Sequence, residues 1–497
     1  MLASVARRVV LPRYRAAAIS TTATTTTTTN PKTKSIINAN YCLFPRHPTT
    51  SSSLQKRLFS STIVRTNNPS LYTWGTDKSG CLLQKYDNDD TDPSTKNNNI
   101  IWEPKLTDLA NKNLLSSSDK IIDVCCGSSE IMLVTDDGKV WVAGENKNGN
   151  LGLGHTDPVK ELTELKVNIG GGINRDSGDD HDHGDHGDSG SNDHRSGSDN
   201  KDIDTTVLFQ KGVLGPNTGA LIAQNGDLYT FGNGGSVISG VGCLGLGNAE
   251  SFLTPQLVHS LAEDGCRVRD VALGESHSTV LTTEGEVLTT GAANYGRLGN
   301  GETYEDTLYF DSVEILSLLP NETVTQISGG ESFTLALTND GVIYGWGRNH
   351  KGQLGTGFGM AVDMYAMEQI PTPMDGEELV NRTVTKVAAG TNHAACVTSG
   401  GELFWWGSSI HLEPVRVDEV LHTKIIDIAC GLDYTLALSE DNELFAWGAG
   451  KTGVLGVGPD TKTLHQAQMI KSLLKKDNEI VSMSAGSTFA SCLVSEL

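Results

Sequence analysis

The chain has 497 residues, of which 37% are hydrophobic and only 6% aromatic, and 55 are glycine. This composition is poor in the large apolar side chains of one thick core, and it favours many short strands separated by glycine turns. The longest apolar candidate, residues 121–134, is interrupted by Asp123, Gly127 and Glu130. It falls short of the roughly 18 apolar residues that cross a membrane, so we expect a soluble protein with no transmembrane segment.

The N-terminal region is basic and free of acids, since the first acidic residue is Asp77. Its arginines and lysines are interspersed with serine and threonine, and it lacks the long apolar run of a secretory signal. These features are typical of an organelle transit peptide. A disordered basic arm that binds nucleic acid is the alternative interpretation.

A short motif predicts where this leader ends. The run Arg57-Leu-Phe-Ser-Ser resembles a mitochondrial processing site with cleavage between Phe59 and Ser60. We therefore expect a cleaved, disordered transit peptide at residues 1–59 and a linker at residues 60–70. The mature protein is expected in mitochondria, in the matrix.

The charge that remains after cleavage limits the possible partners. Loss of residues 1–59 would remove nine of the 38 Lys and Arg residues and none of the 60 Asp and Glu residues. The mature chain would then carry 29 basic against 60 acidic residues, a net charge of −31. Such a surface repels phosphate backbones. We expect no binding of free DNA, contact with RNA only indirectly or through loops, and proteins as partners.

Glycine recurs at a fixed spacing along the chain. In each of six copies an apolar strand ends near a first glycine and resumes beyond it, and a later strand ends at a second glycine 17 residues after the first. A tight turn such as Asn339-Asp-Gly lies between them, which is hairpin chemistry. One spacing in six copies predicts a repeated structural unit. The pairs are Gly127 and Gly144, Gly215 and Gly232, Gly274 and Gly291, Gly330 and Gly347, Gly390 and Gly407, and Gly431 and Gly448.

A Gly-x-Leu-Gly turn follows the second glycine in several copies. Its glycines allow positive φ and close backbone approach, and its leucine can fill the space between neighbouring units. The turn starts at Gly149, Gly296, Gly352 and Gly453, and after a five-residue insertion at Gly242.

The two ends of the repeat region hold fragments that complete one another. Residues 71–75 (Leu-Tyr-Thr-Trp-Gly) form a strand of the second type with no first-type strand before it, and residues 481–494 form a strand of the first type with nothing after it. Joined, they make a seventh unit and remove the exposed sheet edges. The pattern predicts an all-β, seven-bladed β-propeller over residues 71–497, closed by pairing its N- and C-terminal strands.

These motifs resemble the Regulator of Chromosome Condensation repeat family over about residues 71–494. The specific ones are the Trp-Gly strand, the Asn-x-x-Gly-x-Leu-Gly turn that begins at Asn146, and the Gly-x-x-His strand. The resemblance implies four antiparallel strands per blade around a central channel. The third unit departs from the pattern at Gly215-Pro-Asn-Thr, and the sixth lacks the glycine turn after Gly407, so we expect irregular blades there.

The resemblance also implies a protein-binding face. The founding member exchanges guanine nucleotide on the GTPase Ran and binds chromatin, and exchange depends on polar residues on one face, including the histidines of the Gly-x-x-His strands. Only His277 and His393 keep that histidine here, and we expect both on an interaction face. The other five positions hold Glu130, Thr218, Phe333, Tyr434 and Phe489. This loss, together with the acidic charge and the leader, weighs against Ran and chromatin.

Two insertions stand out from the repeats. Residues 170–204 are rich in Asp, His and Gly, and we expect them to be disordered. They are either a solvated spacer or a Zn²⁺ or Ni²⁺ site. Residues 358–383 hold half of the eight methionines, which suit an adaptable protein-binding surface or seal gaps beneath a long loop. These are Met360, Met364, Met367 and Met374.

The sequence carries no recognisable catalytic motif and no Cys/His spacing typical of zinc, so we expect no enzyme and no cofactor. We interpret the chain as a mitochondrial protein-interaction scaffold. Mitochondrial members of the family suggest assembly of the mitochondrial ribosome or processing of its RNA. The alternative is guanine-nucleotide exchange on a dynamin-like or small GTPase of mitochondria. Basic stripes formed by loops would favour RNA, and a focused polar face would favour a GTPase.

Overall fold

The computed structural model describes residues 69–84, 100–107, 109, 119–167, 206–236, 238, 240–301, 303–319, 322–359, 365–374, 376–459, 461–473 and 478–496. The expected transit peptide with its Phe59–Ser60 cleavage site, nearly all of the linker, and the insertion at 170–204 lie outside these residues.

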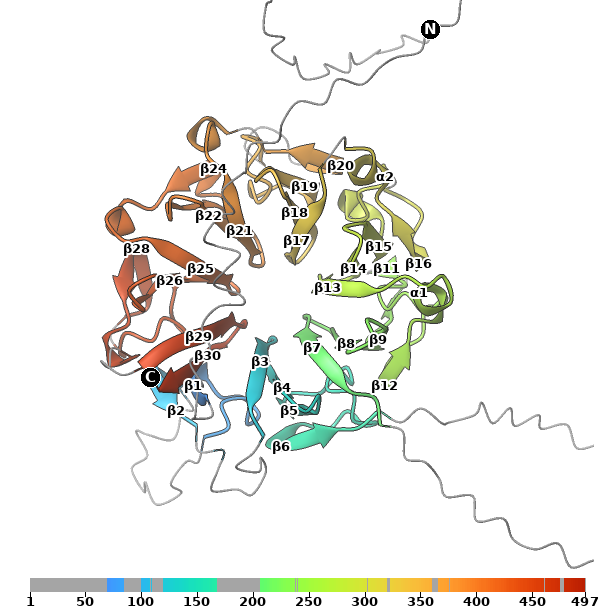
Figure 1. Ribbon diagram of the computed structural model, residues 1–497, viewed down its shortest axis with the longest axis horizontal. Helices are drawn as coiled ribbons and strands as arrows, with labels where there is room; N and C mark the ends of the chain where they lie inside the picture. The colour runs from blue at the N-terminus through green and yellow to red at the C-terminus, as the bar shows by residue number, and fades with distance from the viewer. Residues whose placement is uncertain are drawn as a thin grey trace, which may run out of the picture. The chain divides into compact units, whose positions relative to one another are not determined.

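The described residues form seven four-stranded antiparallel sheets arranged around a centre (Figure 1). The predicted seven-bladed propeller is confirmed. Six blades take their four strands from consecutive segments. In chain order, the first two of these blades are β3 (Ile121–Cys126), β4 (Glu130–Thr135), β5 (Val140–Gly144) and β6 (Val159–Leu165), and then β7 (Phe209–Leu214), β8 (Thr218–Ala223), β9 (Leu228–Gly232) and β12 (Phe252–Leu257). The next two are β13 (Val268–Leu273), β14 (His277–Thr282), β15 (Val287–Gly291) and β16 (Thr307–Ser312), and then β17 (Val324–Gly329), β18 (Phe333–Thr338), β19 (Ile343–Arg348) and β20 (Met367–Pro373). The last two are β21 (Val384–Ala389), β22 (His393–Thr398), β23 (Leu403–Gly407) and β24 (His411–Arg416), and then β25 (Ile425–Cys430), β26 (Tyr434–Ser439), β27 (Leu444–Ala449) and β28 (Thr463–Met469).

The seventh blade is built from both ends of the described chain. Its strand order is β2 (Ile100–Leu106), β1 (Ser70–Thr76), β30 (Phe489–Glu496) and β29 (Asn478–Ala485). β1 pairs with β30 in antiparallel register, with Trp74 opposite Ala490, which confirms the predicted closure. The C-terminal fragment, expected as one strand, is two strands joined by a turn at Gly486.

The fixed glycine spacing follows from the pairing of the second and third strands. Gly291 ends β15 opposite His277, the first residue of β14. At Gly291 φ is +110°, and a Cβ there would lie 2.8 Å from the His277 Cα and meet the Ser276 carbonyl oxygen. Only glycine fits this close approach. Because both strands and their hairpin have constant length, the two glycines recur at constant distance.

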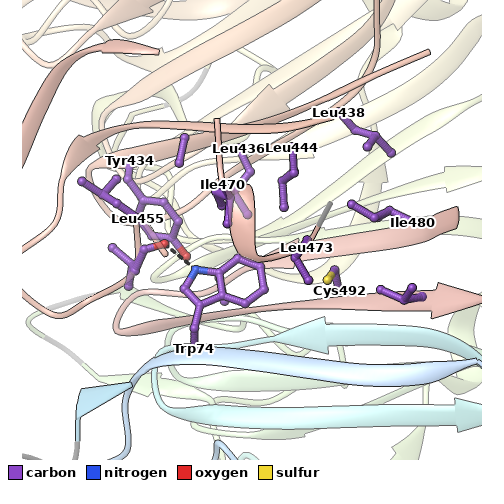
Figure 2. Close-up of a cluster of buried hydrophobic side chains, with 14 residues drawn as sticks. Trp74, Tyr434, Leu436, Leu438, Leu444, Leu455, Ile470, Leu473, Ile480 and Cys492 are labelled. Carbon is purple, nitrogen blue, oxygen red and sulfur yellow. Dashed lines mark hydrogen bonds between the residues drawn. The ribbon is translucent and has the colours of Figure 1, made fainter. Parts of the chain in front are cut away.

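The Gly-x-Leu-Gly turn packs against the next blade wherever it occurs. Its leucine is buried at all five copies. At three of them the carbonyl oxygen just before the leucine accepts a hydrogen bond from the indole of the following blade. Trp346 Nε1 donates to Arg297 O at 3.0 Å, and Trp406 Nε1 donates to Gln353 O at 2.9 Å. The same bond closes the ring, where Trp74 packs in a cluster with Leu455, Ile470 and other apolar side chains (Figure 2). This contact explains why Trp-Gly and Gly-x-Leu-Gly recur together.

The expectation of two irregular blades is not met. Both the third and the sixth unit form four-stranded sheets. In the sixth, Ser408 and Ser409 take positive φ values of 51° and 59° and make the tight turn that glycines would otherwise provide. In the third, the additional residues of the β9–β12 loop form a small hairpin of β10 (Gly235–Ser236) and β11 (Gly240–Val241).

Helices are few and short in the described part of the chain. They are α1 (His259–Glu263), α2 (Glu314–Ser317), and the 3-10 turns η2 (Asn294–Gly296), η3 (Glu377–Leu379), η4 (Asp418–Val420) and η5 (Lys471–Leu473). Among the described residues, no helix has the length and apolar character to cross a membrane.

Candidate functional site

One end of the ring, here called the turn face, carries the polar turns between the first and second strands and the loops between the third and fourth strands of the blades. In an antiparallel blade these two connections lie at the same end. Contacts between blades agree, since Asn148 in the β5–β6 loop donates to Asn217 in the β7–β8 turn at 3.0 Å. The long β19–β20 loop also lies on the turn face.

A cavity of about 740 Å³ lies at the centre of the ring and opens among these turns. All seven blades line it through their inner strands and the turns that follow them, which point to the centre in Figure 1. Residues at its mouth form a chain of polar contacts from blade to blade. Asn217 Nδ2 contacts Glu275 O at 3.4 Å, Glu275 N donates to Glu331 O at 2.9 Å, and Asn392 Nδ2 contacts Glu331 Oε2 at 3.4 Å. The mouth is thus a focused polar rim with two glutamates.

Behind the mouth, the third residue of six of the seven inner strands is charged or polar, whereas in β29 it is the buried Ile480. Lys211 Nζ lies 2.6 Å from Asp270 Oδ1, and Lys386 Nζ lies 2.6 Å from Asp427 Oδ1. Burial raises the pKa of Asp123, although Lys211 opposes that shift. Burial disfavours the charge of Lys211 as well, but Asp270 outweighs it and the pKa of Lys211 is raised. These pairs link neighbouring blades across the channel wall.

The histidines expected on an interaction face lie inside the ring. His277 and His393 are 1% and 3% exposed. His277 Nε2 lies 3.0 Å from Thr334 Oγ1 on the next blade, and His393 Nε2 lies 3.1 Å from Thr435 Oγ1. The imidazoles therefore bridge blades, and only the turns that precede them reach the turn face. A direct contact of these two side chains with a partner does not fit their burial.

All seven residues of this repeat position share the interior location. Each starts the second strand of its blade and is buried, whether it is His, Phe, Tyr, Thr or Glu. Burial lowers the pKa of His277 to about 3 and that of His393 to about 4. Both imidazoles are neutral at physiological pH, and the hydrogen bonds to threonine serve the packing of the ring.

The four methionines of the predicted interaction loop separate in space. Met374 is buried in the core between two blades with Leu354 and Trp406, so it seals the loop from beneath. Met367 is half-buried at the start of β20. Met360 and Met364 lie outside the described residues.

The sequence did not single out a cluster on the turn face around Tyr295. The guanidiniums of Arg297 and Arg348 lie over the Tyr295 ring, 5.2 Å and 4.6 Å from its centroid. Tyr295 precedes the glycine of its turn and has a φ of 63°. The signal available in the sequence was an aromatic residue in this turn position, where the other four turns have Asn148, Val241, Lys351 and Thr452.

Comparison with known proteins shows the family to which the chain belongs. A family model of the RCC1-like domain matches residues 183–492, more than half of the chain. The chain belongs to the RCC1-like domain family. As an RCC1-like protein, it has the fold that its repeats predicted.

Curated relatives of this RCC1-like protein differ in what they do. The ultraviolet-B receptor UVR8 of Arabidopsis thaliana is 32% identical over 288 residues, 58% of this chain and 53% of that protein. The human regulator of chromosome condensation is 26% identical over 57% of this chain and 72% of that protein. The bovine secretion-regulating guanine nucleotide exchange factor is 35% identical over 34% of each chain. This chain spans about half the length of UVR8 and 6% of the human ubiquitin-protein ligase HERC2.

Solved structures share the fold at low identity. Human WBSCR16 superposes with a TM-score of 0.65 at 20% identity, over 87% of this chain and all of that chain. Prp20p of Saccharomyces cerevisiae, whose structure was reported with its binding to Gsp1p and histones, gives 0.65 at 19% identity over 87% and 92%. RCC1-like relatives thus include regulators, exchange factors and protein-binding proteins.

Proposed function

We propose that this RCC1-like protein is a non-enzymatic scaffold that binds a protein partner through its turn face in the mitochondrial matrix. The observation that carries the proposal is the turn face itself. A rigid ring, in which indoles and buried side chains tie each blade to the next, holds a polar rim and exposed aromatic loops in fixed positions. Preorganised loops on a rigid frame lower the entropic cost of binding.

Features of the sequence support the proposed mitochondrial location and the proposed partner complex. The acid-free leader with its Phe59–Ser60 motif supports import into mitochondria. The expected complex is one that assembles the mitochondrial ribosome or processes its RNA, with RNA reached through bound proteins. The net charge of −22 for the whole chain supports this indirect contact.

A second function is favoured by one specific observation. The rim of Asn217, Glu275, Glu331 and Asn392 is a focused polar face rather than a basic stripe. Guanine-nucleotide exchange on a mitochondrial dynamin-like or small GTPase would use such a face. The bovine and human relatives that regulate exchange or chromosome condensation support this alternative.

Cross-linking in isolated mitochondria tests the scaffold. Lysine-reactive cross-links from the tagged full chain to partner proteins, read by mass spectrometry, are expected at Lys147, Lys351 and Lys451, which lie on loops of the turn face. Lys139 and Lys424, near the hairpins at the other end, serve as controls. Partner cross-links confined to the control lysines, or none to any protein, would contradict the proposal.

The identity of the cross-linked partners distinguishes the scaffold function from the exchange function. A ribosome-assembly role predicts ribosomal and assembly proteins among the cross-linked partners. An exchange role predicts a GTPase among them, and release of its bound fluorescent GDP should be accelerated by the purified chain. A cross-linked GTPase whose GDP release does not change would exclude the exchange role.

A further inference from the structure

Tyr295 is held in a conformation that an L-residue rarely adopts. Its φ of 63° lies in the left-handed region, where the Cβ of an L-residue crowds the backbone. The equivalent turn residues Asn148, Lys351 and Thr452 have no positive φ. Backbone strain of this kind gathers at binding sites. The strained turn keeps an aromatic ring 39% exposed on the turn face.

The side chains that lie over this ring are positively charged in a protein that is acidic as a whole, and the rim residues Glu275 and Glu331 interact with Arg297 from the cavity side. Arg297 is 4% exposed and donates to Ser332 Oγ at 2.9 Å, and its Nε has no hydrogen-bond partner within the described ranges. Arg348 and Lys351 form no ion pair within the part of the chain that the structure describes. Burial and the neighbouring Arg348 lower the pKa of His350 to about 4, so the positive charge belongs to the arginines and the lysine.

Apolar side chains border these charges. The 3-10 turn that holds Tyr295 packs against β19 and β20. Arg348 pairs with Met367 across these two strands, and Asn349 N donates to Ala366 O at 2.8 Å. The exposed Tyr365 directly precedes Ala366, so it lies close to Arg348 at the end of the β19–β20 pairing. Phe358 is 54% exposed beside Gly359, where a Cβ would lie 3.5 Å from His350 O.

We infer that this surface, formed by Tyr295, Arg348, Lys351, Phe358, Tyr365 and Met367, binds an acidic protein segment that also carries apolar side chains. The inference rests on the proposed function, because it names the chemistry of the partner that the turn face takes. Carboxylates of the segment pair with Arg348 and Lys351, which have no ion-pair partner among the described residues, and its apolar residues pack on the aromatic rings. Arginine and tyrosine are the residue types that dominate binding energy at protein interfaces.

Charge favours a protein segment over RNA as the occupant. Arg348 and Lys351, without an ion-pair partner in the part of the chain that the structure describes, give local attraction within a chain of net charge −22 but no basic stripe that follows a phosphate backbone. An acidic segment needs only a few carboxylates opposite these cations. The exposed Phe358 and Tyr365 and the half-buried Met367 offer apolar contact that matches Leu or Phe of a peptide.

Fluorescence anisotropy with the full chain tests the inference. The probe is a labelled peptide of about 15 residues in which Glu alternates with Leu and Phe, a length that spans an interface patch. The comparison probes are the same peptide with Gln in place of Glu, and single-stranded polyuridine of equal length. We expect the Glu peptide to bind, its Gln form to bind at least about tenfold more weakly, and its affinity to fall with salt.

Matched variants locate the site. Arg348→Glu should lower the affinity for the Glu peptide at least about tenfold, and Tyr365→Ala should lower it severalfold. Lys105→Glu makes the same charge change on exposed β2 of the closing blade, and Tyr309→Ala removes an exposed ring from β16; neither should change binding. Thermal melting of each variant separates lost binding from lost folding.

Several results would overturn the inference. These are no binding of the Glu peptide, equal binding of its Gln form, unchanged binding by a folded Arg348→Glu chain, or binding of polyuridine alone, which would assign the surface to RNA. If Arg348→Glu still cross-links its partner through the turn-face lysines in mitochondria, the scaffold function stands and only the acidic-segment inference fails.

Discussion

The indole nitrogen of Trp74 donates a hydrogen bond to the carbonyl oxygen of Val454 at 2.7 Å, across 380 positions of sequence. Trp74 belongs to the blade that both ends of the described chain build, and Val454 belongs to the turn between β27 and β28 of the preceding blade. The same bond at Trp346 and Trp406 shows that closure uses the joint that the ring repeats elsewhere.

Trp74→Phe should destabilise the ring because it leaves the buried Val454 carbonyl without its donor. The expected loss in the free energy of unfolding is about 1–3 kcal/mol, measured by urea denaturation. Trp141→Phe is the matched control, since the buried Trp141 Nε1 has no hydrogen-bond partner among the residues that the structure describes. Equal losses for the two variants would show that the indole hydrogen bond is not what joins the blades.

Gly291→Ala should lower the free energy of unfolding more than Gly265→Ala does. Both glycines have positive φ, at +110° and +71°, but an added Cβ at Gly265 meets nothing within 4 Å, whereas at Gly291 it meets the backbone of β14. The control should lose about 1–2 kcal/mol from backbone strain alone, and Gly291→Ala about 1–3 kcal/mol more from overpacking. Equal melting temperatures of the two variants would contradict the account of the glycine spacing.

The buried histidines should make stability depend on pH. An unfolded histidine titrates near 6.5, whereas the folded pKa values of His277 and His393 are about 3 and 4. The unfolded chain then binds more protons below pH 6.5, so stability is full above pH 6.5 and falls as the pH drops toward 4. Each histidine contributes at most about 1.4 kcal/mol per pH unit.

Phenylalanine fills the same repeat position at Phe333 and Phe489, so the double variant His277→Phe, His393→Phe offers a natural replacement. Its free energy of unfolding should change less between pH 7 and pH 5 than that of the wild-type chain. Urea denaturation at both pH values measures the difference. The same pH slope in both proteins would refute the role of the imidazoles.

Truncation after Lys476 should destroy ring closure. It removes β29 and β30, leaves β1 without its neighbour, and takes Phe489, Cys492 and Leu493 out of the core. Each such side chain contributes roughly 1.5–3 kcal/mol, against a typical net stability of about 5–15 kcal/mol. The exposed edges should pair between molecules. A soluble, monomeric 1–476 chain with the same melting temperature as the full chain would disprove closure.

N-terminal sequencing of protein isolated from mitochondria should find a start near Ser60. Cleavage there follows from the Arg57-Leu-Phe-Ser motif at the end of the acid-free leader. Import of a fluorescent fusion into mitochondria is the accompanying measurement. An intact Met1 on the isolated protein, or a fusion found only in the nucleus, would contradict the mitochondrial location.

The repeats alone predicted the propeller because each unit obeys the same local constraints. A glycine such as Gly291 is fixed by backbone contact within one hairpin, so its spacing survives while loops vary. The fragments at residues 71–75 and 481–494 likewise predicted closure, because each lacks the strands that the other supplies. Local sequence could not separate β29 from β30, since the turn at Gly486 interrupts a continuous run of small and apolar residues.

The candidate site depended on the tertiary structure. His277 and His393 carry polar groups that sequence reasoning places on a surface, yet the ring turns them inward onto threonines of the next blade. Tyr295, Arg297 and Arg348 come from two blades and meet only when η2 packs against β19 and β20. Strand periodicity and glycine spacing are local properties that a sequence displays directly. Which loops share the turn face, and which side chains meet there, is decided only by how the blades pack around the ring.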